Sequence, residues 1–150
     1  MTSKRAVDEF MAQETLAVVG VSRSGKGFGN AALRELRANG FRLFPVHPNA
    51  VEVQGLPCSP DLKSLPEPVG GVLIVVPPEQ TEGVVRDAAA AGIPRVWMQQ
   101  GSSSPEALQV CAETGIQAVY GECILMFLAK GPAFHRFHRG LRRLFGRLPA

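Results

Sequence analysis

Hydrophobic and polar positions follow two different periods along this chain, and the elements they predict alternate in type. Short, mostly apolar runs bounded by glycine, proline or polar residues are typical of buried strands, and they occur at 16–19, 41–46, 72–76, 95–98 and 117–120. Stretches of helical spacing and end signals predict helices at 4–13, 31–38, 79–91 and 105–114. Two short extended pieces are expected at 51–53 and 56–59. Strands that alternate with helices in this way favour an α/β fold with a doubly wound parallel sheet.

Length and composition fit one folded domain. With 150 residues, 45% hydrophobic and 19% charged, the chain can bury roughly 70% of its unfolded surface in one core. No apolar run approaches the about 20 residues needed to cross a bilayer, and the N-terminus lacks an apolar signal core, so a cytoplasmic location is expected. The three cysteines, Cys58, Cys111 and Cys123, include no C-x-x-C pair, which favours reduced thiols over disulfides or a metal site.

The segment 131–150 is predicted to be a basic amphipathic helix that extends the domain formed by residues 1–130. Its apolar residues fall on one helical stripe: Phe134, Phe137, Leu141, Leu144, Phe145 and Leu148. Residues 130–150 hold six basic and no acidic residues, so the net charge of +3 comes from this tail and not from the mildly acidic body. The stripe favours docking on the body or on a second protomer of a homodimer, with a membrane surface as an alternative. Nucleic acid is not expected as a partner, because no aromatic platform accompanies the arginines.

The most informative local feature is the glycine-rich, basic loop that follows the first predicted strand. An apolar run ends at Gly20, the loop Gly20–Gly27 reads G-V-S-R-S-G-K-G, and a helical pattern follows from Asn30. A buried strand that leads through such a loop into a helix forms an anion site, because main-chain N–H groups converge and the helix dipole favours negative charge. The loop therefore predicts a phosphorylated small-molecule ligand.

Two familiar nucleotide motifs fit this loop only in part. The loop matches a nucleoside-triphosphate P-loop up to Gly27, which stands where a Ser or Thr must ligate Mg²⁺, so triphosphate hydrolysis is disfavoured. In the dinucleotide fingerprint, Ser22 replaces the glycine that approaches the pyrophosphate, and the segment 44–49 supplies no acid for the ribose. An NAD(P)-binding regulator or small oxidoreductase stays open as the alternative.

Five short motifs, in order along the chain, carry a resemblance to a known family: Val19-Gly20-Val21-Ser22, Pro45-Val46-His47-Pro48-Asn49, Val75-Val76-Pro77-Pro78, Val96-Trp97-Met98-Gln99-Gln100-Gly101 and Glu122-Cys123-Ile124. With these motifs the chain resembles the stand-alone CoA-binding domain proteins, which are similar to the N-terminal domain of the succinyl-CoA synthetase α subunit. The family has Pro-Val-Asn-Pro where this chain has Pro45–Pro48, and Asp-Arg-Cys where it has Gly121–Cys123.

The resemblance implies a Rossmann-type domain that holds CoA across the carboxyl ends of its strands. By position, it implies phosphate contacts at Gly20, Val21, Ser22 and Arg23, adenosine contacts at His47, Pro48 and Asn49, and pantetheine contacts at Pro77, Pro78, Met98, Gln99 and Gln100. Ser24 and Lys26 of the same loop complete the candidate binding residues. Independently, Arg23 suits a phosphate-rich ligand as a bidentate partner. The absence of an acid after the second strand suits a ribose that carries its own phosphate.

The sequence offers no catalytic constellation, so a non-catalytic CoA or acyl-CoA carrier or sensor is expected. The histidines, carboxylates and hydroxyls form no recognisable triad, acid–base pair or metal cluster. Cys123 is the one candidate for chemistry, through a mixed disulfide with CoA, and the competing interpretation is a small buried side chain. Cys58 and Cys111 are expected to be inert, and Trp97 is expected to pack in the core. A partner-binding module whose tail makes the contact is a further possibility.

Overall fold

A central sheet of parallel strands organises the part of the chain that the computed structural model describes, residues 2–128. The order across the sheet is β2-β1-β5-β6-β7. The strands are β1 (Thr15–Val19), β2 (Arg42–Val46), β5 (Gly71–Ile74), β6 (Arg95–Gln99) and β7 (Gln117–Glu122). A small antiparallel hairpin, β3 (Glu52–Val53) with β4 (Leu56–Pro57), follows β2. The predicted helix at 131–150 lies outside the described residues.

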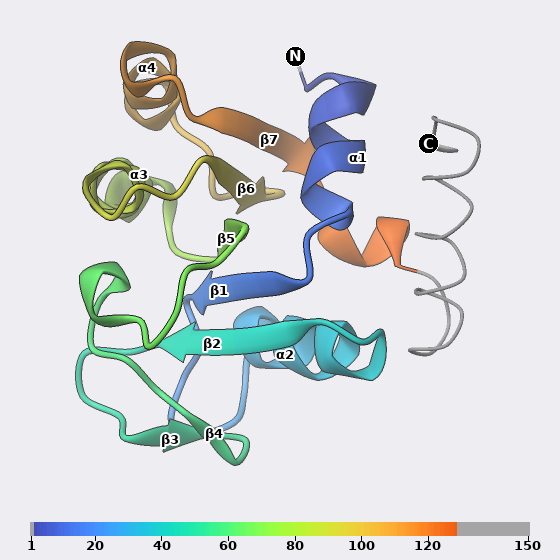
Figure 1. Ribbon diagram of the computed structural model, residues 1–150, viewed down its shortest axis with the longest axis vertical. Helices are drawn as coiled ribbons and strands as arrows, with labels where there is room; N and C mark the ends of the chain where they lie inside the picture. Colours follow the sequence, from blue (N-terminus) through green and yellow to red (C-terminus); the bar gives the residue numbers. More distant parts are fainter. Residues whose placement is uncertain (1, 129–150) are drawn as a thin grey trace.

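Helices cover both faces of this sheet, which gives the doubly wound Rossmann-like architecture (Figure 1). One face carries α1 (Lys4–Met11), α2 (Phe28–Ala38) and the 3-10 helix η2 (Ile124–Phe127). The other carries α3 (Pro78–Ala90), α4 (Pro105–Thr114) and the 3-10 helix η1 (Leu62–Ser64). The predicted fold class is therefore confirmed.

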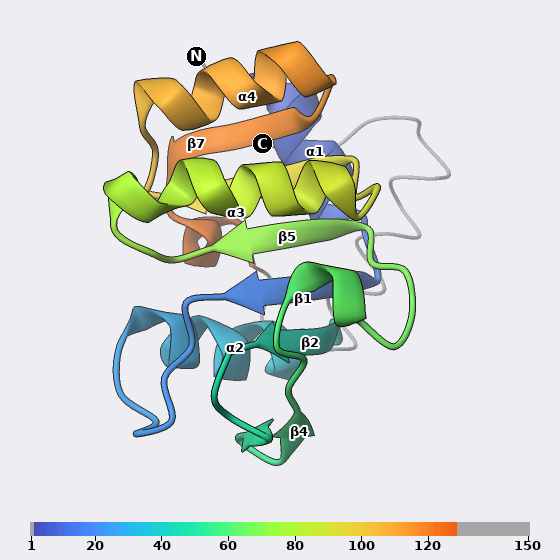
Figure 2. The ribbon, with the colours of Figure 1, turned by 90° about the vertical axis from the view of Figure 1, so that its left-hand side faces the viewer.

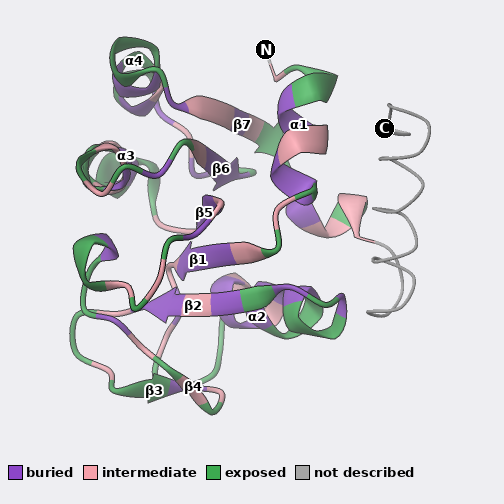
Figure 3. Ribbon diagram, viewed as in Figure 1, coloured by how far each residue is buried: buried purple, intermediate pink, exposed green. Residues whose placement is uncertain are grey.

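Alternation along the strands divides the core into two layers. On β5, Leu73 packs under α1 and α2, whereas Val72 and Ile74 pack under α3 and α4. The inner strands are buried along nearly their whole length (Figure 3), as expected where helices cover both faces of a parallel sheet.

The predicted elements are present, with boundary differences that have local causes. Helix α2 begins at Phe28, not at residue 31, because Gly27 at φ 98° takes the N-cap position. Strand β5 ends at Ile74 rather than at residue 76, and α3 begins at Pro78, where proline suits the first helical turn. The 3-10 helices η1 and η2 were not expected from the pattern of apolar positions.

Trp97 packs in the core, as expected. It is fully buried on β6 and makes edge-to-face contacts with Phe10, at a centroid distance of 5.3 Å, and with Phe127, at 5.5 Å. Its Nε1 donates a hydrogen bond of 3.1 Å to the carbonyl oxygen of Glu122. This residue therefore ties α1 and η2 to the end of β7.

The outer edge of β7 is partly covered by the N-terminal segment. The hydroxyl of Thr2 accepts a hydrogen bond from the main-chain N–H of Tyr120 at 2.8 Å and donates one to its carbonyl oxygen at 2.7 Å. One side chain thus satisfies both main-chain groups of an edge residue.

Candidate functional site

The strand order places a crevice at the carboxyl ends of β1 and β5. From β1 the chain passes to β2 on one side of the sheet, and it later returns to β5 on the other side of β1. Connections that diverge in this way open the ligand crevice typical of doubly wound sheets. Figure 2 shows the arrowheads of β1 and β5 pointing to the same side, where the β1–α2 loop leaves the sheet.

The β1–α2 turn is packed too closely for any side chain at two of its glycines. Gly20 has φ 116°, and a Cβ on it would overlap the carbonyl group of Val75. Gly29 lies in the first turn of α2, and a Cβ there would overlap the carbonyl oxygen of Gly20. These contacts bring the start of α2 directly onto the end of β1, the close approach that anion-binding turns require.

Hydrogen bonds within the loop fix its shape. The hydroxyl of Ser22 donates to the carbonyl oxygen of Lys26 at 2.7 Å and lies 3.1 Å from the hydroxyl of Ser24. The main-chain N–H of Ser22 donates to Oδ1 of the buried Asn30 at 2.7 Å, so it is already occupied within the protein. The loop is therefore held in shape by its own hydrogen bonds, and its residues 23–27 are exposed.

The cations of this loop are exposed. Arg23, Ser24 and Lys26 all lie at the surface, and neither Arg23 nor Lys26 forms an ion pair with any residue in the range 2–128. No side chain caps the N-terminus of α2 either. Positive side chains and an uncapped helix end thus lie together beside the crevice.

The end of β2 forms the second wall. His47 is half-buried, and its Nδ1 accepts a hydrogen bond of 3.0 Å from the main-chain N–H of Asn49. In the neutral imidazole this contact leaves the proton on Nε2. Pro48 and Asn49 are exposed.

A cavity of about 320 Å³ lies between these walls and the helices α3 and η1. The end of β1 contributes Val19, Gly20 and Val21, the end of β2 contributes Val46, His47 and Pro48, and the opposite side contributes Pro60, Asp61, Leu62, Val76, Gln80, Val84 and Asp87. The cavity is mostly apolar, and its lining includes the two carboxylates Asp61 and Asp87. Asp61 also caps η1, since its Oδ1 accepts from the N–H of Ser64 at 2.9 Å.

The sequence-predicted residues at the ends of β5 and β6 differ in their accessibility. Pro77, Pro78 and Gln100 are exposed. The side chain of Met98 is fully buried in the core, and Oε1 of the buried Gln99 accepts a hydrogen bond from the N–H of Ile124 at 3.1 Å. Met98 therefore presents no accessible surface to a ligand at this edge, and Gln99 presents very little.

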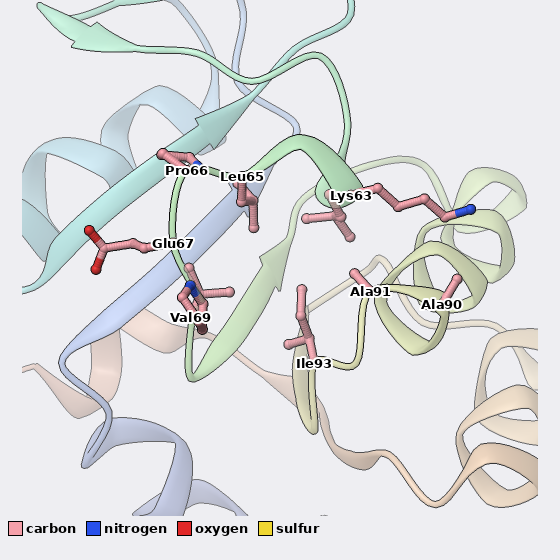
Figure 4. Close-up of a pocket in the computed structure, with 10 residues that line it drawn as sticks. Lys63, Leu65, Pro66, Glu67, Val69, Ala90, Ala91 and Ile93 are labelled. Carbon is pink, nitrogen blue, oxygen red and sulfur yellow. The ribbon is translucent and has the colours of Figure 1, made fainter.

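A larger hollow, of about 520 Å³, lies at the opposite end of the sheet (Figure 4). Its lining includes the apolar residues Leu65, Val69 and Ile93, near the amino ends of β5 and β6. The charged ends of Lys63 and Glu67 extend away from these apolar side chains. Because ligands of doubly wound sheets bind at the carboxyl ends, this hollow is not the candidate site.

The described residues contain no feature of a metal site or a membrane span. No group of three or more His, Cys, Asp or Glu in residues 2–128 is placed to hold a metal ion. No helix in that range is long and apolar enough to cross a membrane.

The cysteines occupy different environments. Cys123 is half-buried just before η2, and Cys111 is a buried residue of α4 that packs in the core. Burial, and to a smaller extent the charge of Glu52, raise the pKa of the Cys58 thiol. Burial alone raises the pKa of the Cys111 thiol to about 11.

The Cys111 thiol is expected to be protected from reagents in the folded protein. Its raised pKa favours the neutral form on folding. The resulting stabilisation is fully present below the unfolded value of 9.0 and is lost as the pH rises towards about 11, at about 1.4 kcal/mol per pH unit. Titration with an aromatic disulfide at pH 8 should modify Cys111 only after unfolding in urea. Equal rates with and without urea would contradict this environment.

Several residues of the site were missed by the sequence reasoning. Asp61, Gln80 and Asp87 come from η1 and α3, whose packing against the strand ends has no local signal. Asn30 did have a local signal in the sequence, because it is a polar residue three positions before Leu33 and therefore lies on the same apolar face of the helix.

Comparison with known proteins identifies the family of this chain. A family model described as a CoA binding domain matches residues 14–129. The uncharacterized protein YneT of Bacillus subtilis is 28% identical over 123 residues, covering 81% of this chain and 91% of that protein. A conserved hypothetical protein from Pyrococcus furiosus superimposes with a TM-score of 0.72 at 33% identity, covering 76% of this chain and 98% of the other.

A much longer enzyme matches this chain over a small part of its own length. The ADP-forming acetate–CoA ligase II of Archaeoglobus fulgidus is 33% identical over 82 residues, which is 53% of this chain but 12% of the ligase. The resemblance drawn from the five sequence motifs is thus confirmed, and this chain belongs to the CoA-binding domain family.

Proposed function

We propose that this protein binds CoA or an acyl-CoA across the carboxyl ends of its strands and acts as a carrier or sensor without a catalytic step of its own. The observation that carries the proposal is the cavity at the ends of β1 and β2, bordered by a preformed glycine loop with exposed cations. Membership of the CoA-binding domain family supports the choice of ligand.

The phosphates of CoA belong at the glycine loop. Arg23 and Lys26 are exposed there beside the uncapped N-terminus of α2, and both the guanidinium group and the helix end favour an anion. Because the loop is held by its own hydrogen bonds, little conformational freedom is lost when a phosphate binds.

The adenine ring belongs in the cavity. Apolar side chains such as Val46 and Val76 can contact the faces of the ring, and Asp61 and Asp87 also line the cavity. Carboxylate oxygens only accept hydrogen bonds at neutral pH, so they suit an exocyclic amine and repel phosphate. The charges thus orient the ligand, with its anionic groups towards Arg23 and its base towards α3.

The pantetheine arm would then run along the ends of β5 and β6. The exposed Pro77, Pro78 and Gln100 border this path, and Cys123 follows β7 at its far side. At 320 Å³ the cavity is at the small end of ligand sites and holds only part of CoA, so the arm would lie in the open crevice. A mixed disulfide of CoA with Cys123 stays an untested prediction.

Replacing Arg23 by alanine should weaken CoA binding by about 10- to 100-fold, the usual loss for one hydrogen bond to a charged group. Calorimetric titration of the full chain with CoA, acetyl-CoA, NAD and NADP measures this loss and the ligand preference together. Wild-type protein should prefer CoA, and a CoA concentration 100 times the dissociation constant should add about 2.7 kcal/mol of stability.

Arg34→Ala is the matched control, because Arg34 is an exposed arginine of α2 outside the loop. It should leave CoA affinity unchanged. Tighter binding of NAD or NADP than of CoA would favour the dinucleotide alternative. Unchanged CoA affinity in Arg23→Ala would contradict phosphate recognition by this loop, whereas equal losses of CoA and NAD affinity would mean that Arg23 contacts the pyrophosphate that both ligands carry.

A further inference from the structure

Hydrogen bonds connect the β3–β4 hairpin to the glycine loop through the buried Asn30. The side chain of Asn30 is completely inaccessible to solvent. Its Oδ1 accepts from the N–H of Ser22 at 2.7 Å, and its Nδ2 donates to the carbonyl oxygen of Ser22 at 3.0 Å. The amide therefore clamps Ser22 from both sides of its main chain.

Gln54, at the turn of the hairpin, holds Asn30 in place. Its Nε2 donates to the main-chain carbonyl oxygen of Asn30 at 2.8 Å. The main-chain carbonyl oxygen of Gln54 accepts a hydrogen bond from Nη1 of Arg37, on α2, at 3.1 Å. Two contacts thus join this turn to α2 and, through Asn30, to the loop.

The backbone of Gln54 is itself strained. Its φ is 54°, and among residues 2–128 it is the only residue other than glycine with a positive φ. Such a conformation is unfavourable for a residue with a side chain and persists only where the surroundings impose it. The two-residue turn Gln54-Gly55 between β3 and β4 imposes it here, since tight hairpin turns favour positive φ at both central positions, and the hydrogen bonds to α2 hold that turn in place.

We infer that Asn30 and Gln54 are positioning residues, which set the glycine loop in the shape that receives the phosphates of CoA. The inference rests on the proposed function. Neither side chain needs to touch the ligand, because Asn30 acts by consuming the main-chain groups of Ser22. The exposed residues Arg23 and Lys26 are then the ones left to face the phosphates. A preordered loop binds more tightly than a mobile one, because the ordering cost is met during folding.

Gln54→Gly is the decisive variant. Glycine removes the side-chain donor to Asn30 but adopts positive φ without strain, so the fold is not penalised. Asn30→Ala removes the clamp itself, and Gln109→Ala is the control, because Gln109 is exposed on α4 and bonds only Glu113 within the described chain.

Two measurements test the inference. Without ligand, amide hydrogen exchange at Ser22 should be about fivefold faster in Gln54→Gly and faster still in Asn30→Ala, while amides of α4 are unchanged. With ligand, calorimetry well below the melting temperature should show CoA affinity reduced by about fivefold in Gln54→Gly and unchanged in Gln109→Ala.

The outcomes separate this inference from the proposed function. Unchanged exchange at Ser22, or equal acceleration in α4, would overturn the positioning role, because the effect would then be absent or global. Unchanged CoA affinity in Gln54→Gly would overturn it as well. If wild-type protein does not bind CoA, the proposed function fails, while Ser22 exchange still decides whether the hairpin orders the loop.

Discussion

Replacing Gly20 by alanine is expected to destabilise the protein by about 3 kcal/mol or more, since backbone strain and overpacking act together. At φ 116° the new Cβ would overlap the carbonyl group of Val75. Val75 directly follows β5, and its main-chain N–H donates to the carbonyl oxygen of Val19 at 2.8 Å. It therefore cannot move without disturbing the pairing of β1 with β5. Thermal unfolding followed by circular dichroism should show a melting temperature lower by roughly 10 °C.

Gly25→Ala is the matched control for this prediction. Gly25 also has positive φ, 79°, but a Cβ there meets no atom within 4 Å. It should lose only the roughly 1–2 kcal/mol of a left-handed residue. Equal losses in the two variants would mean that close packing at Gly20 contributes nothing beyond its backbone conformation.

Replacing Trp97 by alanine is expected to cost about 3–5 kcal/mol, a large part of the 5–15 kcal/mol typical of a whole domain. The ring is fully buried between Phe10 and Phe127, so its loss leaves a cavity between α1, η2 and the sheet. Urea unfolding followed by far-ultraviolet circular dichroism measures the change, since the substitution removes the fluorescent probe.

Trp97→Phe separates the ring from its hydrogen bond. Phenylalanine keeps most of the aromatic packing but removes the Nε1 donor that lies 3.1 Å from the carbonyl oxygen of Glu122, which still accepts from the N–H of Gln100 at 3.2 Å. The expected loss from this hydrogen bond is about 1 kcal/mol. A loss as large as that of Trp97→Ala would assign the stability to the hydrogen bond rather than to the ring contacts.

The fold could be predicted because its strands and helices are marked by short local patterns in the sequence. The apolar run at 72–76 reads as a buried strand on its own, and the proline after it fits the start of α3. By contrast, η1 and η2 are single turns whose apolar residues show no repeat. Their positions depend on packing between segments distant in sequence, such as Ile124 against Gln99.

The candidate site was predictable only where it follows a strand directly. The loop after β1 and the segment after β2 were found because glycine and proline mark strand ends. The cavity also needs α3 and η1, which reach it through the tertiary fold. The burial of Met98 could not be predicted from the sequence either, because apolar residues are found both in the interior of a strand and at a strand end that borders the crevice.

The hydroxyl of Thr2, bonded to Tyr120 at the border of β7, also bears on self-association. Unpaired border strands are templates for aggregation, and proteins block them with local obstacles. A strand from a neighbouring molecule could add to β7 at this position only by displacing the N-terminus. Proteolytic removal of Thr2 would therefore expose the main-chain groups of Tyr120 on the edge strand β7 and favour aggregation of an otherwise intact molecule.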